Sequence, residues 1–123
     1  MPDSNTHILI IDDNEDILFM LKAMLKHKGY KVSIKENTEN IEPYIKEIAP
    51  DIILMDMLLS GADGREICMQ LKCNPALMHI PVIMISAHPH AKKECIEAGA
   101  DFFLDKPFEM IGLFNAIESL LPI

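Results

Sequence analysis

The chain has 123 residues, half of them hydrophobic and 24% charged, and its net charge is −8 at pH 7. This length corresponds to one domain, residues 1–123, with enough chain to bury a single core. The negative charge and the lack of a Lys/Arg cluster argue against direct binding to nucleic acid, and no apolar run approaches the ~20 residues that span a membrane.

The cysteines and the N-terminus indicate the compartment. Cys68, Cys73 and Cys95 are odd in number and form no C-x-x-C pair, so neither a disulfide framework nor a zinc site is expected. Residues 1–7 lack the apolar core of a signal peptide. These features favour a cytoplasmic protein.

Short apolar runs alternate along the chain with segments of helical periodicity, which is typical of βαβ units. The runs predict five strands, at residues 7–12, 31–35, 51–56, 81–86 and 100–104. The runs ILII, IILM and VIMI do not alternate with polar residues, as expected of central strands covered on both faces. Residues 31–35 do alternate, so they are expected at a sheet edge.

Helices are expected in the gaps between these strands and after the last one. Apolar residues at positions 17, 18, 21, 24 and 25 form one stripe of a helix that ends near Gly29. The remaining helices are expected at residues 38–48, 64–73, 90–98 and 107–121. Pro43 lies inside the segment 38–48 and argues against a helix there. Nine methionines at helix and strand spacing are interpreted as core residues.

Strict alternation of five strands and five helices predicts an α/β fold, a doubly wound five-stranded parallel sheet with helices on both faces. In the flavodoxin-like strand order 2-1-3-4-5, the order reverses between the first and third strands. Asp12 and Asp13 close the first strand and Asp56 closes the third. The three carboxylates should therefore meet at one crevice.

Such a group of carboxylates calls for a cation. At about 4 Å, each pair repels by on the order of 1 kcal/mol in water and about 4 kcal/mol at an effective dielectric constant of 20. A hard divalent cation offsets this repulsion, and an oxygen-only ligand set favours Mg²⁺. Each aspartate alone would more often cap a helix or form a turn, so the prediction depends on all three together.

Four motifs in order carry a family resemblance. IDDNEDI, LMDMLLSGADG, MISAH and GADFFLDKPF together resemble the receiver domain of bacterial two-component response regulators, in a stand-alone form like the chemotaxis regulators. The resemblance implies that Asp56 is the phosphate acceptor, that Asp13 binds Mg²⁺ directly and that Asp12 binds it mainly through water. The carbonyl oxygen of Leu58 would complete the protein ligands.

The resemblance also assigns residues around the phosphoryl group. It implies that Ser86 and Lys106 contact the phosphoryl oxygens, and that Phe103 is the aromatic switch residue coupled to Ser86. It further implies a cis peptide bond between Lys106 and Pro107.

The implied function is signalling. The donor would be a phosphohistidine of a sensor histidine kinase or histidine phosphotransfer protein, or a small acyl phosphate. The domain would catalyse its own phosphorylation and dephosphorylation without being an enzyme for another substrate. Its output would be contact with a downstream protein, and the chain would be a monomer or a weak homodimer.

Two other functions are open to this sequence. An aspartyl-nucleophile phosphohydrolase has a second Asp two residues after the nucleophile, where this chain has Leu58. A pseudo-receiver would be a binding module that never turns over phosphate, and loss of any one site residue would favour it.

Three departures from the family stand out. Ser60 replaces the proline common after the acceptor strand, which should loosen that loop. Ser86 replaces the commoner threonine and keeps the hydroxyl. Only 13 positions separate Ser86 from Gly99, about two fewer than in the family, so the fourth helix or the loop before it should be short.

Overall fold

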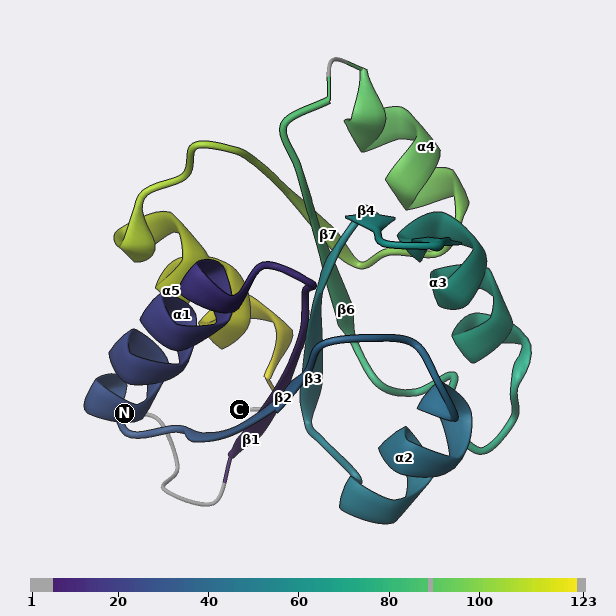
Figure 1. Ribbon diagram of the computed structural model, residues 1–123, viewed down its shortest axis with the longest axis horizontal. Helices are drawn as coiled ribbons and strands as arrows, with labels where there is room; N and C mark the ends of the chain where they lie inside the picture. The colour runs from purple at the N-terminus through teal and green to yellow at the C-terminus, as the bar shows by residue number, and fades with distance from the viewer. Residues whose placement is uncertain (1–5, 89, 122–123) are drawn as a thin grey trace.

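A parallel five-stranded sheet lies between two layers of helices in the computed structural model, which describes residues 6–88 and 90–121 (Figure 1). Its strands are β1 (His7–Ile11), β2 (Lys31–Lys35), β3 (Ile52–Asp56), β6 (Val82–Ser86) and β7 (Phe102–Asp105). They lie in the order β2-β1-β3-β6-β7, and every neighbouring pair is parallel. The predicted order 2-1-3-4-5 is confirmed. The two ends of the predicted domain, residues 1–5 and 122–123, lie outside the described residues.

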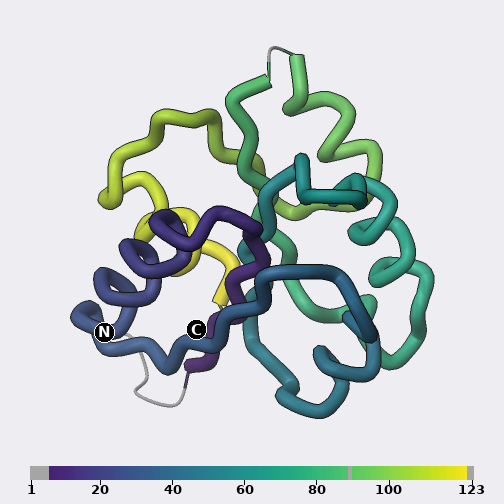
Figure 2. The backbone as a smooth tube through the Cα atoms, viewed as in Figure 1, coloured from purple at the N-terminus to yellow at the C-terminus, as the bar shows by residue number. Residues whose placement is uncertain are grey.

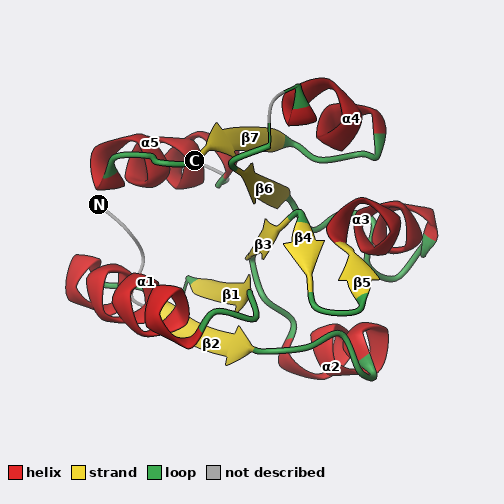
Figure 3. Ribbon diagram, turned by 45° about the horizontal axis from the view of Figure 1, so that its top comes forward, coloured by secondary structure: helices red, strands yellow, loops and turns green. Residues whose placement is uncertain are grey.

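The helices divide between the two faces of the sheet. They are α1 (Glu15–Lys28), α2 (Ile41–Ile48), α3 (Gly64–Cys73), α4 (Ala91–Glu97) and α5 (Met110–Leu120). Helices α1 and α5 cover one face, and α2, α3 and α4 cover the other (Figure 3). Within residues 6–88 and 90–121, no helix is long and apolar enough to cross a membrane.

Each central strand contributes to two cores. Leu9 and Ile11 pack on the side of α2 to α4, whereas Ile8 and Ile10 pack on the side of α1 and α5. Because both faces are covered, β1 is buried along its whole length, which explains its run of apolar residues. Strand β2 is only partly buried, as expected for an edge.

Local chemistry sets the helix ends. The Asn14 side chain accepts hydrogen bonds from the N–H groups of Asp16 and Ile17 at 2.9 and 3.1 Å and so caps α1. Helix α2 begins at Ile41, three residues later than expected, and Pro43 lies in its first turn, where backbone N–H groups have no helical acceptor.

The C-terminal helices are shorter than expected. Helix α4 has seven residues instead of the nine expected at 90–98, and a short helix is what the spacing between Ser86 and Gly99 indicated. Helix α5 begins at Met110 instead of residue 107, because residues 106–109 return from the sheet edge to the helical layer. The Lys106–Pro107 peptide bond is cis, as the resemblance implied.

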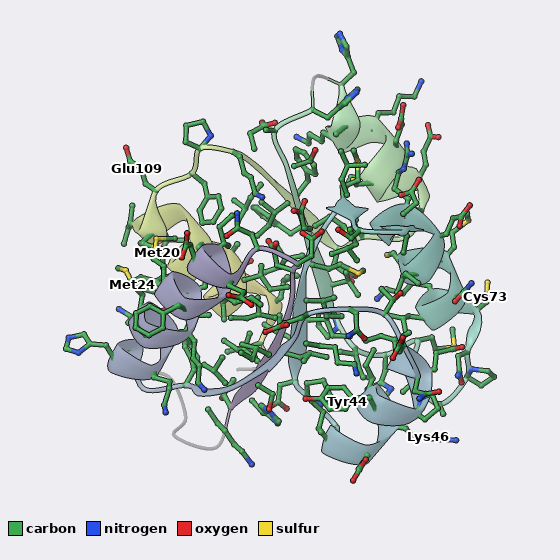
Figure 4. The ribbon with its side chains drawn as sticks, viewed as in Figure 1. Met20, Met24, Tyr44, Lys46, Cys73 and Glu109 are labelled. Atoms are coloured by element: carbon green, nitrogen blue, oxygen red, sulfur yellow. The ribbon has the colours of Figure 1, made fainter. Side chains whose placement is uncertain are left out.

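Two features differ from the sequence prediction. An unpredicted antiparallel hairpin follows β3, formed by β4 (Leu58–Leu59) and β5 (Ala62–Asp63). The methionines are not all core residues, since four of them are 38–53% exposed on helices and loops: Met20, Met24, Met69 and Met78. Figure 4 shows Met20 and Met24 on the outer side of α1. Helix spacing alone does not say which stripe faces the sheet.

Candidate functional site

Three carboxylates meet at the carboxyl edge of the sheet. Asp12 and Asp13 directly follow β1, and Asp56 is the last residue of β3. Oxygens of the three lie within 4.8 Å of one another, and among the described residues they form the one group of three His, Cys, Asp or Glu side chains that could hold a metal ion. Figure 2 shows the chain leaving β1 and β3 side by side. The predicted convergence of these aspartates is therefore present.

Asp12 is the buried member of this acidic cluster. It is 3% exposed, and its Oδ1 accepts a hydrogen bond from the Asn14 N–H at 2.9 Å. Burial raises the pKa of Asp12, and the neighbouring charges of Asp56 and Asp13 raise it further, against the opposing effects of the Asn14 hydrogen bond and Lys106. A carboxylate in this position gains from a nearby cation.

Asp13 is exposed and is held by the hairpin. The backbone N–H and the hydroxyl of Ser60 both donate to Asp13 Oδ2, at 2.8 and 2.6 Å. Hydrogen bonding from Ser60 lowers the pKa of Asp13. The expectation that Ser60 loosens this loop is wrong, because the residue ties the loop to Asp13 and stands in the two-residue turn of a hairpin. The adjacent Gly61, with φ at 74°, was the sequence signal for that turn.

Asp56 faces Lys106 across the edge of the sheet. Lys106 Nζ lies 3.2 Å from Asp56 Oδ2 and 4.0 Å from Asp12 Oδ2. The Leu58 N–H points to Asp56 Oδ1 at 3.3 Å, and the Leu58 side chain is 56% exposed at the rim. One ammonium group thus stands beside two of the three carboxylates.

Ser86 and Phe103 lie on the two strands beyond Asp56. Asp56 is in register with Ile85, so Ser86 comes one position further toward the carboxyl edge. Ser86 is 3% exposed, and its Oγ accepts the His88 N–H at 2.9 Å. Phe103 pairs with Met84, and its ring is buried in the core beneath α3 and α4.

Gly64, the first residue of α3, is a site residue that the sequence motifs did not indicate. A Cβ atom at this position would lie 2.5 Å from the carbonyl oxygen of Asp56 and 3.0 Å from that of Met57. The Gly64 N–H donates to the Met57 carbonyl at 2.7 Å. Helix α3 therefore packs directly on the backbone of the strand end that carries Asp56. The sequence signal was a glycine directly after the helix-capping Asp63.

The family model of the response regulator receiver domain matches residues 8–118. The chain belongs to this family. Receiver domains are signalling phosphoacceptors of two-component systems, they accept phosphoryl groups from histidine kinases, and they bind Mg²⁺ in an acidic cleft. The acidic cluster of this receiver domain offers only hard oxygen donors, which is the ligand set that Mg²⁺ prefers.

Known receiver proteins resemble the chain over nearly its full length. The response regulator PleD of Caulobacter vibrioides is 35% identical over 118 residues, which cover 94% of this chain and 26% of PleD. A putative response regulator from Chloroflexus aurantiacus has a crystal structure with a TM-score of 0.88 and 30% identity, covering 94% of this chain and 97% of that one. This receiver domain thus spans about a quarter of PleD.

A third neighbour shows the same fold. The receiver domain of the sensor histidine kinase PA1611 from Pseudomonas aeruginosa has a TM-score of 0.85 and 24% identity, over 94% of this chain and 97% of that one. In that structure a magnesium ion is coordinated in the active-site cleft.

Proposed function

We propose that this receiver domain accepts a phosphoryl group on Asp56 from a phosphohistidine of a sensor histidine kinase or histidine phosphotransfer protein. The observation that carries the proposal is the position of Asp56 between two kinds of charge. Its carboxylate belongs to the acidic cluster with Asp12 and Asp13, and Lys106 Nζ lies 3.2 Å from its Oδ2. Asp12 has the same two kinds of neighbour, but its side chain is 4% exposed against 15% for Asp56, and it lies farther from Lys106 Nζ, at 4.0 Å.

The transfer exchanges one bond for another. A carboxylate oxygen of Asp56 attacks phosphorus and forms an acyl phosphate, while the bond from phosphorus to the donor histidine breaks and its electron pair stays on the imidazole. Such a transfer needs in-line positioning and cancellation of the negative charge on three equatorial oxygens more than covalent help. Lys106 donates to one of these oxygens and the Ser86 hydroxyl to another.

The acidic cluster and the family resemblance together support a set of metal ligands. Asp13 and Asp56 would bind Mg²⁺ through their carboxylates, Leu58 through its carbonyl oxygen, and Asp12 mainly through water. Bound Mg²⁺ supplies positive charge at the phosphoryl group. In proteins Mg²⁺ usually binds few carboxylates and keeps several waters, and this site has the composition for such binding.

The domain itself catalyses its own phosphorylation and the later hydrolysis of the acyl phosphate on Asp56, and it acts on no other substrate. A phosphohydrolase of the aspartyl class needs a general acid two residues after the nucleophile, and the apolar Leu58 cannot serve as one. We place the reaction in the cytoplasm, where Cys68, Cys73 and Cys95 stay free thiols.

The output is contact with a downstream protein. Ser86 and Phe103 would couple the phosphoryl group to the face formed by β7, α5 and the short α4. The net charge of −8 disfavours direct contact with nucleic acid. Helix α5 carries no Lys or Arg between Met110 and Leu120, so a charge-paired dimer is not expected, and we expect a monomer or a weak homodimer.

Incubation with Mg²⁺ and acetyl phosphate, read by intact mass, tests this function. The parent should gain one phosphoryl group, Asp56→Asn should gain none, and Asp16→Asn, an exposed aspartate of α1, should label like the parent. Labelling of Asp56→Asn would refute the site. Release of inorganic phosphate without any labelled protein would indicate a phosphohydrolase, and no reaction at all would indicate a pseudo-receiver.

A further inference from the structure

Ser60 connects the β4–β5 hairpin to the acidic cluster. Its N–H and its hydroxyl both donate to Asp13 Oδ2, at 2.8 and 2.6 Å. A carboxylate oxygen has two lone pairs in its plane, and two donors occupy them. Asp13 Oδ1 is then the oxygen that a cation can bind without displacing Ser60.

The same contact joins the two segments that hold the expected ligands. Asp13 belongs to the loop after β1, and Asp56 and Leu58 belong to the end of β3 and the strand that follows. Ser60 is 47 residues from Asp13 and two residues from Leu58. Because this link holds both segments before a cation binds, less conformational freedom is lost on binding.

We propose that Ser60 is a positioning residue of the magnesium site, which orients the Asp13 carboxylate and fixes the loop after β1 to the hairpin. The inference rests on the proposed function, because it takes the acidic cluster to be a Mg²⁺ site. Hydrogen-bond partners of metal-binding carboxylates are typically worth about 10- to 100-fold in metal affinity. Both the N–H and the hydroxyl of Ser60 donate to Asp13 Oδ2, so the effect of Ser60 is exerted through Asp13.

Three substitutions separate its two donors. Ser60→Thr keeps both the N–H and the hydroxyl, Ser60→Ala removes the hydroxyl, and Ser60→Pro removes both. Proline fits the turn, since φ is positive at Gly61 but not at Ser60, the combination found in type II turns, which accept proline at the first central position. Ser119→Ala is the matched control, because that hydroxyl donates to the Ala116 carbonyl in α5.

Calorimetric titration with Mg²⁺ alone, together with thermal unfolding of the metal-free proteins, tests the inference. Ser60→Pro should raise the Kd for Mg²⁺ about tenfold and Ser60→Ala by a smaller factor, while Ser60→Thr and Ser119→Ala bind like the parent. Rescue by threonine at an unchanged melting temperature separates positioning of Asp13 from general stability. If the proline variant does not fold, Ser60→Ala decides, because it keeps every backbone N–H.

Two outcomes would contradict the role of Ser60, and they differ in what they say about the proposed function. If the parent binds Mg²⁺ and labels with acetyl phosphate while Ser60→Ala and Ser60→Pro bind as tightly, only the role of Ser60 is wrong. If the parent binds no Mg²⁺, the proposed function fails and the inference fails with it.

Discussion

Lys106 Nζ lies 3.2 Å from Asp56 Oδ2 although the two residues are 50 positions apart in the chain. The contact spans the sheet from the end of β7 to the end of β3, and it brings the ammonium group within 4.0 Å of Asp12 Oδ2 as well. The acidic cluster thus has one fixed positive charge. The position suits a group that neutralises a phosphoryl oxygen bound at Asp56.

Replacement of Lys106 by alanine should slow phosphorylation by acetyl phosphate about 10²- to 10³-fold, the usual effect of removing one donor to a developing negative charge. Lys106→Arg should recover only part of the rate, because a planar guanidinium does not reproduce a compact ammonium. Lys93→Ala, at an 85% exposed lysine of α4, is the control. A rate constant for Lys106→Ala equal to that of the parent, measured by mass spectrometry, would exclude the assigned role.

The raised pKa of Asp12 predicts that the free energy of unfolding depends on pH. Burial raises the pKa of Asp12 in the folded protein above the unfolded value of about 3.9. At a pH between the two pKa values, the folded protein therefore keeps a proton on Asp12 that the unfolded chain has lost. Stability from this group is present below about pH 4 and declines as the pH rises from there through the raised folded pKa. Metal-free Asp12→Asn should therefore be more stable than the parent at pH 7, by on the order of 1 kcal/mol from relief of charge repulsion.

Urea unfolding at pH 7 and near pH 3.5 measures the difference in free energy of unfolding between Asp12→Asn and the parent, with Asp16→Asn as control. This difference should shrink at the lower pH. Saturating Mg²⁺ should reduce or reverse it, because a ligand that binds the folded parent more tightly stabilises the parent more. An Asp12→Asn variant that is less stable than the parent at pH 7 without metal would contradict the argument.

Gly64 and Gly112 form a matched pair of helical glycines. A methyl group at Gly64 would meet the Asp56 carbonyl oxygen at 2.5 Å, whereas one at Gly112 in α5 would meet nothing within 4 Å. Gly64→Ala should lower the free energy of unfolding by about 1 to 3 kcal/mol and slow labelling of Asp56, because α3 or the strand end must move. Gly112→Ala should be stabilising by about 0.5 to 1 kcal/mol. Equal effects of the two substitutions would show that the close packing at Gly64 has no consequence.

Phe102 and Phe103 lie on opposite faces of β7, with Phe102 36% exposed and Phe103 8% exposed. A phosphoryl group on Asp56 offers Ser86 a charge-assisted hydrogen bond, which should draw the loop after β6 inward and favour the buried ring of Phe103. Chemical-shift mapping with a phosphoryl mimic should therefore show changes through residues 87–121. Phe103→Leu should reduce these distant changes, and Phe102→Leu should not. Changes confined to the phosphorylation pocket in the parent would count against the coupling.

The sequence alone determined the five strands, the edge position of the second and the members of the acidic cluster, and the strand order followed from the flavodoxin-like fold that this alternation predicts. Runs such as ILII and IILM identify strands that are covered on both faces, and the alternating residues 31–35 identify an edge. Once strands 1 and 3 are neighbours, the end of each must lie at the same edge of the sheet, so Asp12, Asp13 and Asp56 had to converge. Lys106, Ser86 and Phe103 were assigned through motif resemblance and not through periodicity.

Only the tertiary structure decided how the site is held. The β4–β5 hairpin has strands of two residues, too short for a hydrophobic period, and the Ser60 contact with Asp13 joins residues 47 positions apart. The packing of Gly64 on the Asp56 carbonyl likewise depends on the approach of a helix to a strand end. Periodicity reports which face of an element is buried, whereas these contacts depend on distances between elements, which are set when the two layers of helices close on the sheet.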